Sequence, residues 1–154
     1  MSVTAEGSTV HATAIIIGES GILIRGEAGS GKSSVARELI ARAENLGRHA
    51  ALVADDRVLL HRAGGRLIAS TVSPVAGLLE IRGIGIVRVP HEPAAVLRLI
   101  VDLADEPPRV PDDDAIKASV EGVPLPKITV NPALGAGVVL WTLGQLHDAF
   151  MTVS

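Results

Sequence analysis

A glycine-rich motif near the N-terminus constrains this sequence more than any other feature. Residues 26–33 read Gly-Glu-Ala-Gly-Ser-Gly-Lys-Ser and match the pattern G-x-x-x-x-G-K-[ST] at every fixed position. The motif follows an apolar run that ends at Ile24, and the segment from Ser33 to Asn45 has apolar residues at helical spacing. A strand, a glycine loop and a helix in this order predict a phosphate-binding loop, and with it an α/β fold.

Each part of the motif has a chemical role in binding a nucleoside triphosphate. Glycines let backbone N–H groups surround the phosphates, and the N-terminus of the helix adds a partial positive charge. Lys32 is expected to neutralise the β- and γ-phosphates and Ser33 to hold Mg²⁺. The alternative is a glycine-rich turn that ends in a helix cap. We predict that ATP and Mg²⁺ are bound here, with the nucleotide held by Gly26, Glu27, Ala28, Gly29, Ser30, Gly31, Lys32 and Ser33.

The composition supports one globular domain with an aliphatic core. The chain has 154 residues, 47% of them hydrophobic and 20% charged, and its only aromatic residues are Trp141 and Phe150. This length fits a single domain, so we expect one domain over residues 1–154. Short runs of Val, Ile, Leu and Ala are typical of strands buried on both faces, which again favours an α/β fold.

Charge and cysteine content argue against several classes of protein. The net charge of −3 does not favour nucleic acid or an anionic membrane, and the absence of cysteine excludes disulfides and thiolate chemistry. No apolar run approaches the roughly 18–20 residues that span a bilayer. Residues 1–9 have no Lys or Arg ahead of an apolar stretch, as a secretory signal would. We therefore expect a soluble cytoplasmic protein without nucleic-acid or membrane partners.

Apolar runs broken by glycine or proline predict the other elements. A glycine pair at residues 64–65 indicates a tight hairpin turn. Residues 104–114 are rich in proline and acidic residues and are expected to form an exposed loop. A C-terminal helix is expected over residues 134–151. The predicted strands lie at residues 14–17, 22–24, 50–54, 59–60, 67–68, 78–89, 96–103, 116–120 and 125–130.

Two acidic residues, Asp55 and Asp56, directly follow the apolar run at residues 50–54. A phosphate-binding loop needs a carboxylate at the end of a neighbouring strand for Mg²⁺, and transfer to a hydroxyl benefits from a carboxylate that accepts the proton. Because side chains alternate along a strand, one carboxylate is expected to face the metal and the other the nucleophile, unless the strand has already turned. The alternative is that two polar residues simply open a loop.

Three further charged residues interrupt apolar sequence. His11 begins the first predicted strand, where a lone histidine is most often structural or exposed. Glu80 and Arg82 lie within the otherwise apolar residues 78–86, and charges there need partners. They are expected either to pair with each other or to recognise phosphate or metal.

Taken in order, these motifs resemble the HPr kinase/phosphorylase family. The resemblance extends over residues 8–90 and implies an α/β P-loop kinase fold with a mixed central sheet, related to the phosphoenolpyruvate carboxykinase-like fold. It rests on His11, the loop at residues 26–33, Leu-Val-Ala-Asp-Asp-Arg-Val at 52–58 and Leu-Glu-Ile-Arg-Gly-Ile-Gly-Ile at 79–86. Beyond this range the resemblance thins, and Pro-Lys-Ile-Thr-Val at 126–130 is similar to a family segment near the C-terminus.

The resemblance also implies an activity. It implies a hexameric serine kinase that uses ATP and Mg²⁺ to phosphorylate the phosphocarrier protein HPr, and that also removes the phosphate with inorganic phosphate. Such an enzyme regulates the phosphotransferase system and carbon metabolism. The implied roles are phosphate binding for Lys32, Mg²⁺ binding for Ser33 and Glu80, acid/base catalysis for Asp56 with support from Asp55, assistance at the phosphate site for His11, and the position of a functional arginine for Arg109.

Two departures from the family pattern leave alternatives open. Family members commonly carry a separate N-terminal domain, so this chain is expected to be a short form. Gly135-Ala136-Gly137 stands where the family has Gly-Arg-Asn, in a region linked to dephosphorylation, which favours the kinase over the phosphorylase direction. One alternative is a nucleotide-binding regulatory module with little turnover. Another is a small-molecule P-loop kinase or a carboxykinase relative, against which stands the lack of an extended substrate lid in 154 residues.

Overall fold

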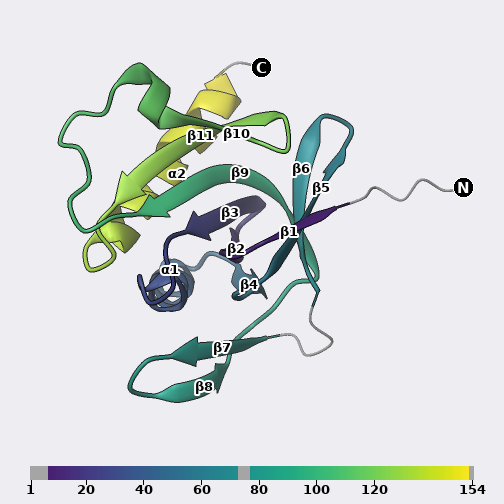
Figure 1. The fold of residues 1–154 in the computed structure, drawn as a ribbon, viewed down its shortest axis with the longest axis vertical. Coiled ribbons are helices and arrows are strands. Elements are labelled where there is room, and N and C mark those ends of the chain that lie inside the picture. The colour runs from purple at the N-terminus through teal and green to yellow at the C-terminus, as the bar shows by residue number, and fades with distance from the viewer. Residues whose placement is uncertain (1–6, 73–76, 153–154) are drawn as a thin grey trace, which may run out of the picture.

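A curled sheet of nine strands forms the centre of the protein in the computed structural model, which describes residues 7–72 and 77–152 (Figure 1). Residues 1–6, part of the segment expected to lack a secretory signal, lie outside the described residues. The strands of this sheet are β1 (Ser8–Val10), β2 (Thr13–Ile17), β3 (Ser20–Arg25), β4 (Ala50–Ala54), β5 (Val58–Ala63), β6 (Arg66–Thr71), β9 (Ala94–Leu103), β10 (Lys117–Val120) and β11 (Val123–Val130).

Strand directions in this sheet are mixed, as predicted. The order is β1-β5-β6-β9-β3-β2-β4, with β11 beside β9 and β10 beside β11. Strands β3 and β11 both run parallel to β9, and the other pairs are antiparallel. The carboxyl ends of β3, β9 and β11 therefore meet at one edge of the sheet, where α/β folds bind their ligands.

Two helices, α1 (Lys32–Asn45) and α2 (Gly135–Thr152), pack on one face of the sheet. In α1, Val35, Leu39 and Ala43 are buried, at the helical spacing that the sequence showed. Strand β3 contributes Ile22 and Ile24 to the apolar cluster under the helices, whereas other strand residues form a second cluster on the opposite face. The expected aliphatic core with strands buried on both faces is confirmed.

The segment at residues 78–89 is a hairpin and not the single interrupted strand that we predicted. It forms β7 (Leu78–Ile81) and β8 (Gly85–Arg88), an antiparallel pair that makes a separate two-stranded sheet (Figure 1). Gly83 and Gly85 take positive φ values of 87° and 108°, so the glycines reverse the chain here. The β7–β8 hairpin packs on the core through Leu79 and Ile81, which are buried.

Two residues predicted to begin strands, His11 and Ile116, lie before those strands. His11 does not begin a strand, and lies in a bend between β1 and β2. Strand β1, with three mostly exposed residues, was not predicted at all. The acidic loop after β9 contains a short 3₁₀ helix, η1 (Asp113–Ile116), so Ile116 precedes β10 instead of starting it. The strand at residues 50–54 and the glycine turn at 64–65 are confirmed.

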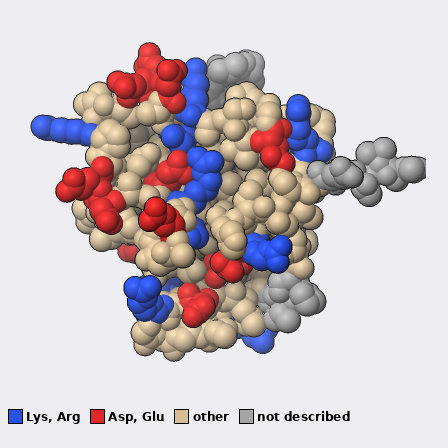
Figure 2. Space-filling model, viewed as in Figure 1, with Lys and Arg blue, Asp and Glu red and all other residues tan. Residues whose placement is uncertain are grey.

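The surface in view carries charges of both signs (Figure 2). Figure 2 shows acidic and basic side chains mixed over the face in view, with no large area of one sign. Within the described residues, neither helix is both long and apolar enough to cross a membrane.

Candidate phosphate-binding and phosphotransfer site

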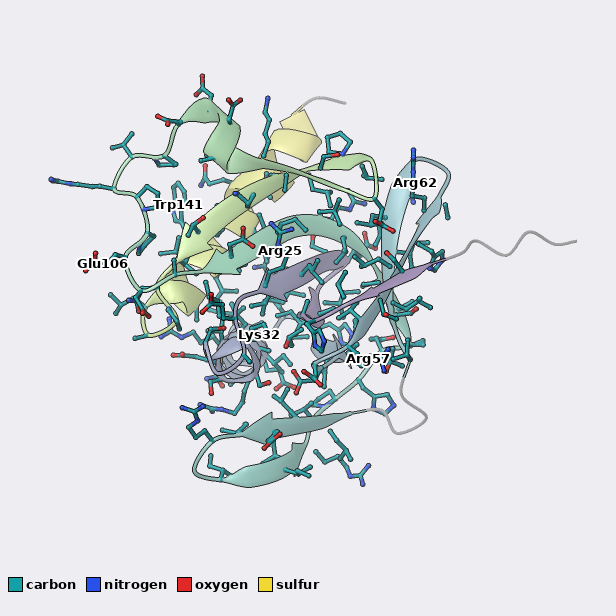
Figure 3. All side chains as sticks on the ribbon, in the orientation of Figure 1. Arg25, Lys32, Arg57, Arg62, Glu106 and Trp141 are labelled. Atoms are coloured by element: carbon teal, nitrogen blue, oxygen red, sulfur yellow. The ribbon has the colours of Figure 1, made fainter. Side chains whose placement is uncertain are left out.

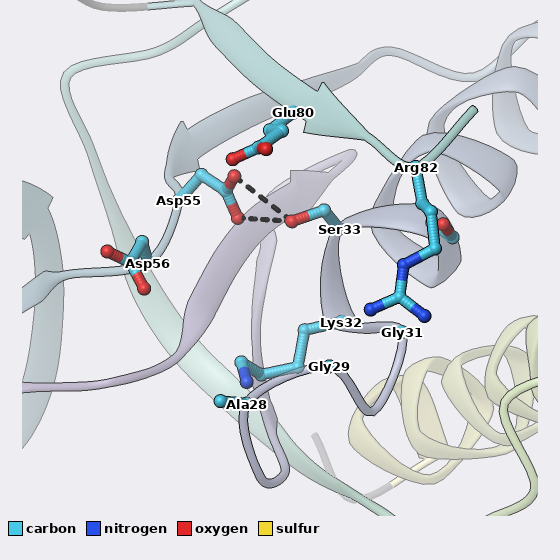
Figure 4. Close-up of a pocket in the computed structure, with 10 residues that line it drawn as sticks. Ala28, Gly29, Gly31, Lys32, Ser33, Asp55, Asp56, Glu80 and Arg82 are labelled. Atoms are coloured by element: carbon cyan, nitrogen blue, oxygen red, sulfur yellow. Dashed lines mark hydrogen bonds between the residues drawn. The ribbon is translucent and has the colours of Figure 1, made fainter. Parts of the chain in front are cut away.

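The glycine motif forms a loop between the end of β3 and the start of α1 (Figure 4). Gly29 and Gly31 have φ values of 80° and 100°, in the left-handed region that disfavours other residues. The Ser30 amide donates to the Glu27 carbonyl at 3.0 Å, and the Val35 amide donates to the Gly31 carbonyl at 2.9 Å. The loop therefore turns tightly into the N-terminus of α1, which is a favourable site for phosphate.

Lys32 folds back across this loop. Its Nζ donates to the carbonyls of Gly26 and Glu27 at 2.9 and 3.1 Å. The ammonium group is thus held over the inside of the loop, where a bound phosphate would compete for the same hydrogen-bond donors. This placement agrees with the phosphate-binding role expected for Lys32.

Asp55 is the half-buried carboxylate that faces the loop. The Ser33 hydroxyl donates to its Oδ1 and Oδ2 at 2.9 and 3.0 Å, and the Thr13 hydroxyl donates to Oδ1 at 2.7 Å. Hydrogen bonds to a carboxylate are among the stronger ones in proteins, so Asp55 has a fixed orientation beside Ser33. Hard oxygen donors of this kind suit Mg²⁺.

Thr13 is a site residue that sequence reasoning missed. It is fully buried in β2 and is the buried polar residue of the described core. A signal was present, since a threonine within the apolar residues 12–17 needs a hydrogen-bond partner when buried. The sequence did not indicate that the partner would be Asp55, which lies 42 positions away.

Asp56 points away from its neighbour because the strand has already turned. Strand β4 ends at Ala54, the Arg57 amide donates to the Asp55 carbonyl at 2.8 Å, and Asp56 has a φ of 69°. Its side chain is 80% exposed and lies 3.7 Å from His11, measured from Oδ1 to Nδ1. Positive φ at a residue other than glycine is uncommon and is often found at functional sites.

The β7–β8 hairpin brings Glu80 and Arg82 to the opposite side of the loop. In Figure 4 the Glu80 carboxylate faces Asp55 and Ser33, and Arg82 extends toward the loop. A Cβ atom placed on Gly29 would lie 3.4 Å from Arg82 Nη2. No ion pair joins Glu80 to Arg82 within the described residues, so the purely structural pairing is not observed.

These side chains line one pocket of about 530 Å³, which we call the Asp55 pocket. Such a volume is typical of small-ligand sites. In the described chain, no three acidic or histidine side chains form a metal site by themselves. Mg²⁺ commonly takes one or two carboxylates together with phosphate oxygens. The pocket is lined by Ala28, Gly29, Gly31, Lys32, Ser33, Ser34, Asp55, Asp56, Glu80 and Arg82.

Comparison with known proteins agrees with this geometry. Residues 2–105 match the family model described as the HPr Serine kinase C-terminal domain. The chain belongs to the HPr serine kinase C-terminal domain family. The matched range includes the loop, both aspartates and the β7–β8 hairpin.

Individual relatives of this HPr serine kinase domain show how far the similarity extends. An HPr kinase/phosphorylase of Neisseria meningitidis is 35% identical over 121 residues, which are 73% of this chain and 34% of the relative. One of Clostridium tetani is 42% identical over 86 residues, which are 56% of this chain and 26% of the relative. This chain therefore spans about a third or less of the length of these curated relatives.

A solved structure confirms the fold class. The Hpr(Ser) kinase/phosphatase from Coxiella burnetii superimposes with a TM-score of 0.73 and 30% sequence identity, covering 94% of this chain and 93% of the other. The predicted α/β P-loop kinase fold with a mixed sheet is thus confirmed, and so is the family that the motifs indicated.

Two predicted site residues of the HPr serine kinase domain lie apart from the Asp55 pocket. His11 is not among its lining residues and reaches the site only through Asp56. Arg109 is exposed in the loop after β9 and lies outside the lining of this pocket. The proposed role of Arg109 therefore stays a prediction.

Proposed function

We propose that this domain is a kinase that transfers the γ-phosphate of ATP, with Mg²⁺, to a serine hydroxyl of an HPr-type phosphocarrier protein. The observation that carries the proposal is the meeting of four separate segments in one pocket: the loop, the end of β4, the N-terminus of α1 and the β7–β8 hairpin. Membership of the HPr serine kinase family supports the choice of substrate.

The nucleotide end of the mechanism is positioning and charge neutralisation. Backbone amides of the loop and the Lys32 ammonium bind the β- and γ-phosphates. Ser33 and Glu80 would hold Mg²⁺, with Asp55 orienting Ser33. The metal, when bound, neutralises developing charge on the transferring phosphoryl group. Arg82 lies on the hairpin side, where its guanidinium can hold a phosphate oxygen.

The acceptor end depends on Asp56. Its exposed carboxylate lines the Asp55 pocket and can accept the proton of an incoming serine hydroxyl. The serine oxygen then bonds to the γ-phosphorus, and the bond between that phosphorus and the bridging β–γ oxygen breaks to release ADP. His11, 3.7 Å from Asp56, stabilises the carboxylate when the imidazole is protonated.

The same residues serve the removal of phosphate from phosphoserine by inorganic phosphate. Inorganic phosphate attacks the phosphoserine phosphorus, the bond from phosphorus to the serine oxygen breaks, and Asp56 returns the proton to that oxygen. The products are serine and pyrophosphate. We regard this direction as the weaker one, because Gly135-Ala136-Gly137 replaces the cation-bearing family segment.

Incubation of the protein with ATP, Mg²⁺ and the HPr protein of the same cell tests this proposal, with mass spectrometry to locate phosphoserine. A single phosphorylated serine is expected. Tight ATP binding without any transfer would instead support a nucleotide-binding regulatory module, and transfer to a small molecule would support a different kinase. A hexameric assembly, one catalytic domain over residues 1–154, a cytoplasmic location and control of the phosphotransferase system are part of the same proposal.

A further inference from the structure

A second pocket lies on the other flank of the phosphate-binding loop. It measures about 730 Å³, and we call it the strand-end pocket. It shares Ala28 and Gly29 with the Asp55 pocket, so the loop forms a common wall between the two. The strand-end pocket is lined by Arg25, Gly26, Glu27, Ala28, Gly29, Ser30, Asp102, Leu103, Ala104, Asp105 and Pro132.

Its position follows from the three parallel strands. Arg25 of β3 is paired in register with Asp102 of β9, and Leu103 of β9 with Val130 of β11. The strand-end pocket therefore lies just beyond the carboxyl ends of β3, β9 and β11. Open α/β sheets bind ligands in the crevice at such strand ends. Asp55 follows β4, on the opposite side of β3 from β9 and β11, so the two pockets flank the loop on opposite sides.

The charge of the strand-end pocket suits hydroxyl groups better than phosphate. Arg25 donates to Asp102 at 2.7 and 3.0 Å in a two-point ion pair, and Lys127 Nζ lies 3.7 Å from the same carboxylate, so Asp102 is paired with two cations and Arg25 is already engaged. Glu27 and Asp105 remain as exposed acids, and neither takes part in an ion pair among the described residues. Carboxylates of this kind accept hydrogen bonds from ribose hydroxyls in other nucleotide-binding folds.

The wall beside Asp105 is ordered by backbone and amide contacts. The Asn131 side-chain amide donates to the Asp105 carbonyl at 2.9 Å, and the Ala104 amide donates to the Val130 carbonyl at 3.0 Å. These bonds fix the Asp105 segment against the turn that carries Pro132. Leu103, Ala104 and Pro132 add an apolar surface on which a planar base can pack.

We propose that the strand-end pocket holds the nucleoside part of the bound nucleotide, with the Asp105 carboxylate accepting a hydrogen bond from a ribose hydroxyl. The triphosphate then lies along the loop, with its γ end in the Asp55 pocket. This inference rests on the proposed nucleotide-binding function and adds to it the determinant that distinguishes a nucleotide from a bare polyphosphate.

Calorimetry with three Mg²⁺-bound probes tests the inference on the full chain: ATP, 2′,3′-dideoxy-ATP and inorganic tripolyphosphate. Loss of a hydrogen bond to a charged group weakens binding about tenfold to a hundredfold. Asp105→Ala is expected to bind ATP more weakly by that factor and to bind dideoxy-ATP with the affinity of the wild type. Ala104→Phe, which fills the pocket, is expected to weaken the binding of ATP and of dideoxy-ATP but not the binding of tripolyphosphate.

The adjacent Glu106 provides the matched control, because it is exposed, lies outside both pockets and points away from the body of the protein (Figure 3). Glu106→Ala is expected to leave all three affinities unchanged. Unchanged ATP affinity in Asp105→Ala overturns the inference, whatever the Ala104 variant does. If the wild type binds neither ATP nor tripolyphosphate, the proposed function itself fails, which is a distinguishable result.

Discussion

The two sides of the Asp55 pocket are built in different ways. On one side, the loop, α1 and the end of β4 are extensions of the nine-stranded sheet, and hydrogen bonds from Ser33 and Thr13 fix Asp55 there. On the other side, Glu80 and Arg82 sit on the β7–β8 hairpin, which belongs to a separate two-stranded sheet. Strand pairing within the main sheet therefore positions one half of the site, whereas the other is positioned by side-chain packing and by two backbone hydrogen bonds that join Leu52 of β4 to Pro90 and Glu92, just after β8.

This difference teaches how the halves divide the chemistry. The sheet side supplies the groups that must be rigid, namely the phosphate-binding amides, Lys32 and the Asp55 carboxylate. The hairpin side supplies a carboxylate and a guanidinium from an element held by Leu79 and Ile81. We expect loss of Lys32 or of an aspartate carboxylate on the sheet side to abolish binding or chemistry, and changes on the hairpin side, or to Thr13 behind Asp55, to weaken them.

Lys32→Ala is expected to have the largest effect. It removes the ammonium group that donates to the Gly26 and Glu27 carbonyls and that we expect to bind the phosphates. Binding of ATP and stabilisation of the transition state are then lost together. Transfer should fall by about 10³–10⁵-fold, the range for loss of a cation that stabilises a transferring phosphoryl group. The fold should survive, as circular dichroism would show. If calorimetry shows that this variant binds Mg²⁺-bound ATP with wild-type affinity, the assignment of the loop as the phosphate-binding site is wrong.

Asp56→Asn is expected to separate chemistry from binding on the sheet side. The amide keeps the shape but cannot accept the serine proton, so single-turnover transfer should fall by about 10²–10⁴-fold with little change in ATP affinity. Asp55→Asn is the comparison, and it should alter Mg²⁺ dependence as well, because its two oxygens hold Ser33. If Asp55→Asn alone shows the pure rate defect, the roles within the pair are reversed.

Glu80→Gln tests the hairpin side directly. The substitution keeps size and removes charge, so transfer should fall about tenfold to a hundredfold and the Mg²⁺ concentration for half-maximal rate should rise. Titration of the rate with Mg²⁺ measures both. Glu19→Gln, in the exposed turn between β2 and β3, is the control. If Glu80→Gln has the wild-type rate and Mg²⁺ dependence, Glu80 does not bind the metal and its role is structural.

Leu79→Ala loosens the hairpin without touching its charged residues. Leu79 is fully buried, so the free energy of unfolding should fall by about 2–5 kcal/mol. Transfer should drop about tenfold at temperatures where the protein is folded, because Glu80 loses its fixed position, while tripolyphosphate binding persists. Ile86→Ala, at a side chain that is 71% exposed, should change stability by less than about 0.5 kcal/mol. Equal effects of the two substitutions in urea unfolding would contradict the packing account.

Thr13→Val is expected to have the smallest effect on transfer, about a few-fold. It removes one hydrogen bond to a carboxylate that keeps its Ser33 contacts, at a cost of roughly 1–3 kcal/mol of stability. Thr13→Ser restores the hydroxyl and should recover the wild-type rate of transfer. No recovery in the serine variant would show that Thr13 acts by packing alone.

Local patterns were sufficient for the central part of the fold. The loop at residues 26–33, helix α1 and the strand that ends at Ala54 were all predicted, because glycine content, helical spacing and short aliphatic runs are properties of adjacent residues. The pattern at residues 78–89 predicts one strand instead of the β7–β8 hairpin, because Gly83 and Gly85 could equally mark a close backbone passage.

The sequence by itself determined the phosphate-binding loop, the aliphatic two-sided core and the acidic pair at the end of a strand. Only the tertiary structure decided which aspartate serves the loop, because a φ of 69° at Asp56 and hydrogen bonds from residues 22 and 42 positions away set the two side-chain directions. It also decided that Asp102 and Asp105 meet the loop at the ends of three parallel strands. Strand pairing joins residues distant in sequence, and no local pattern specifies which ends will meet.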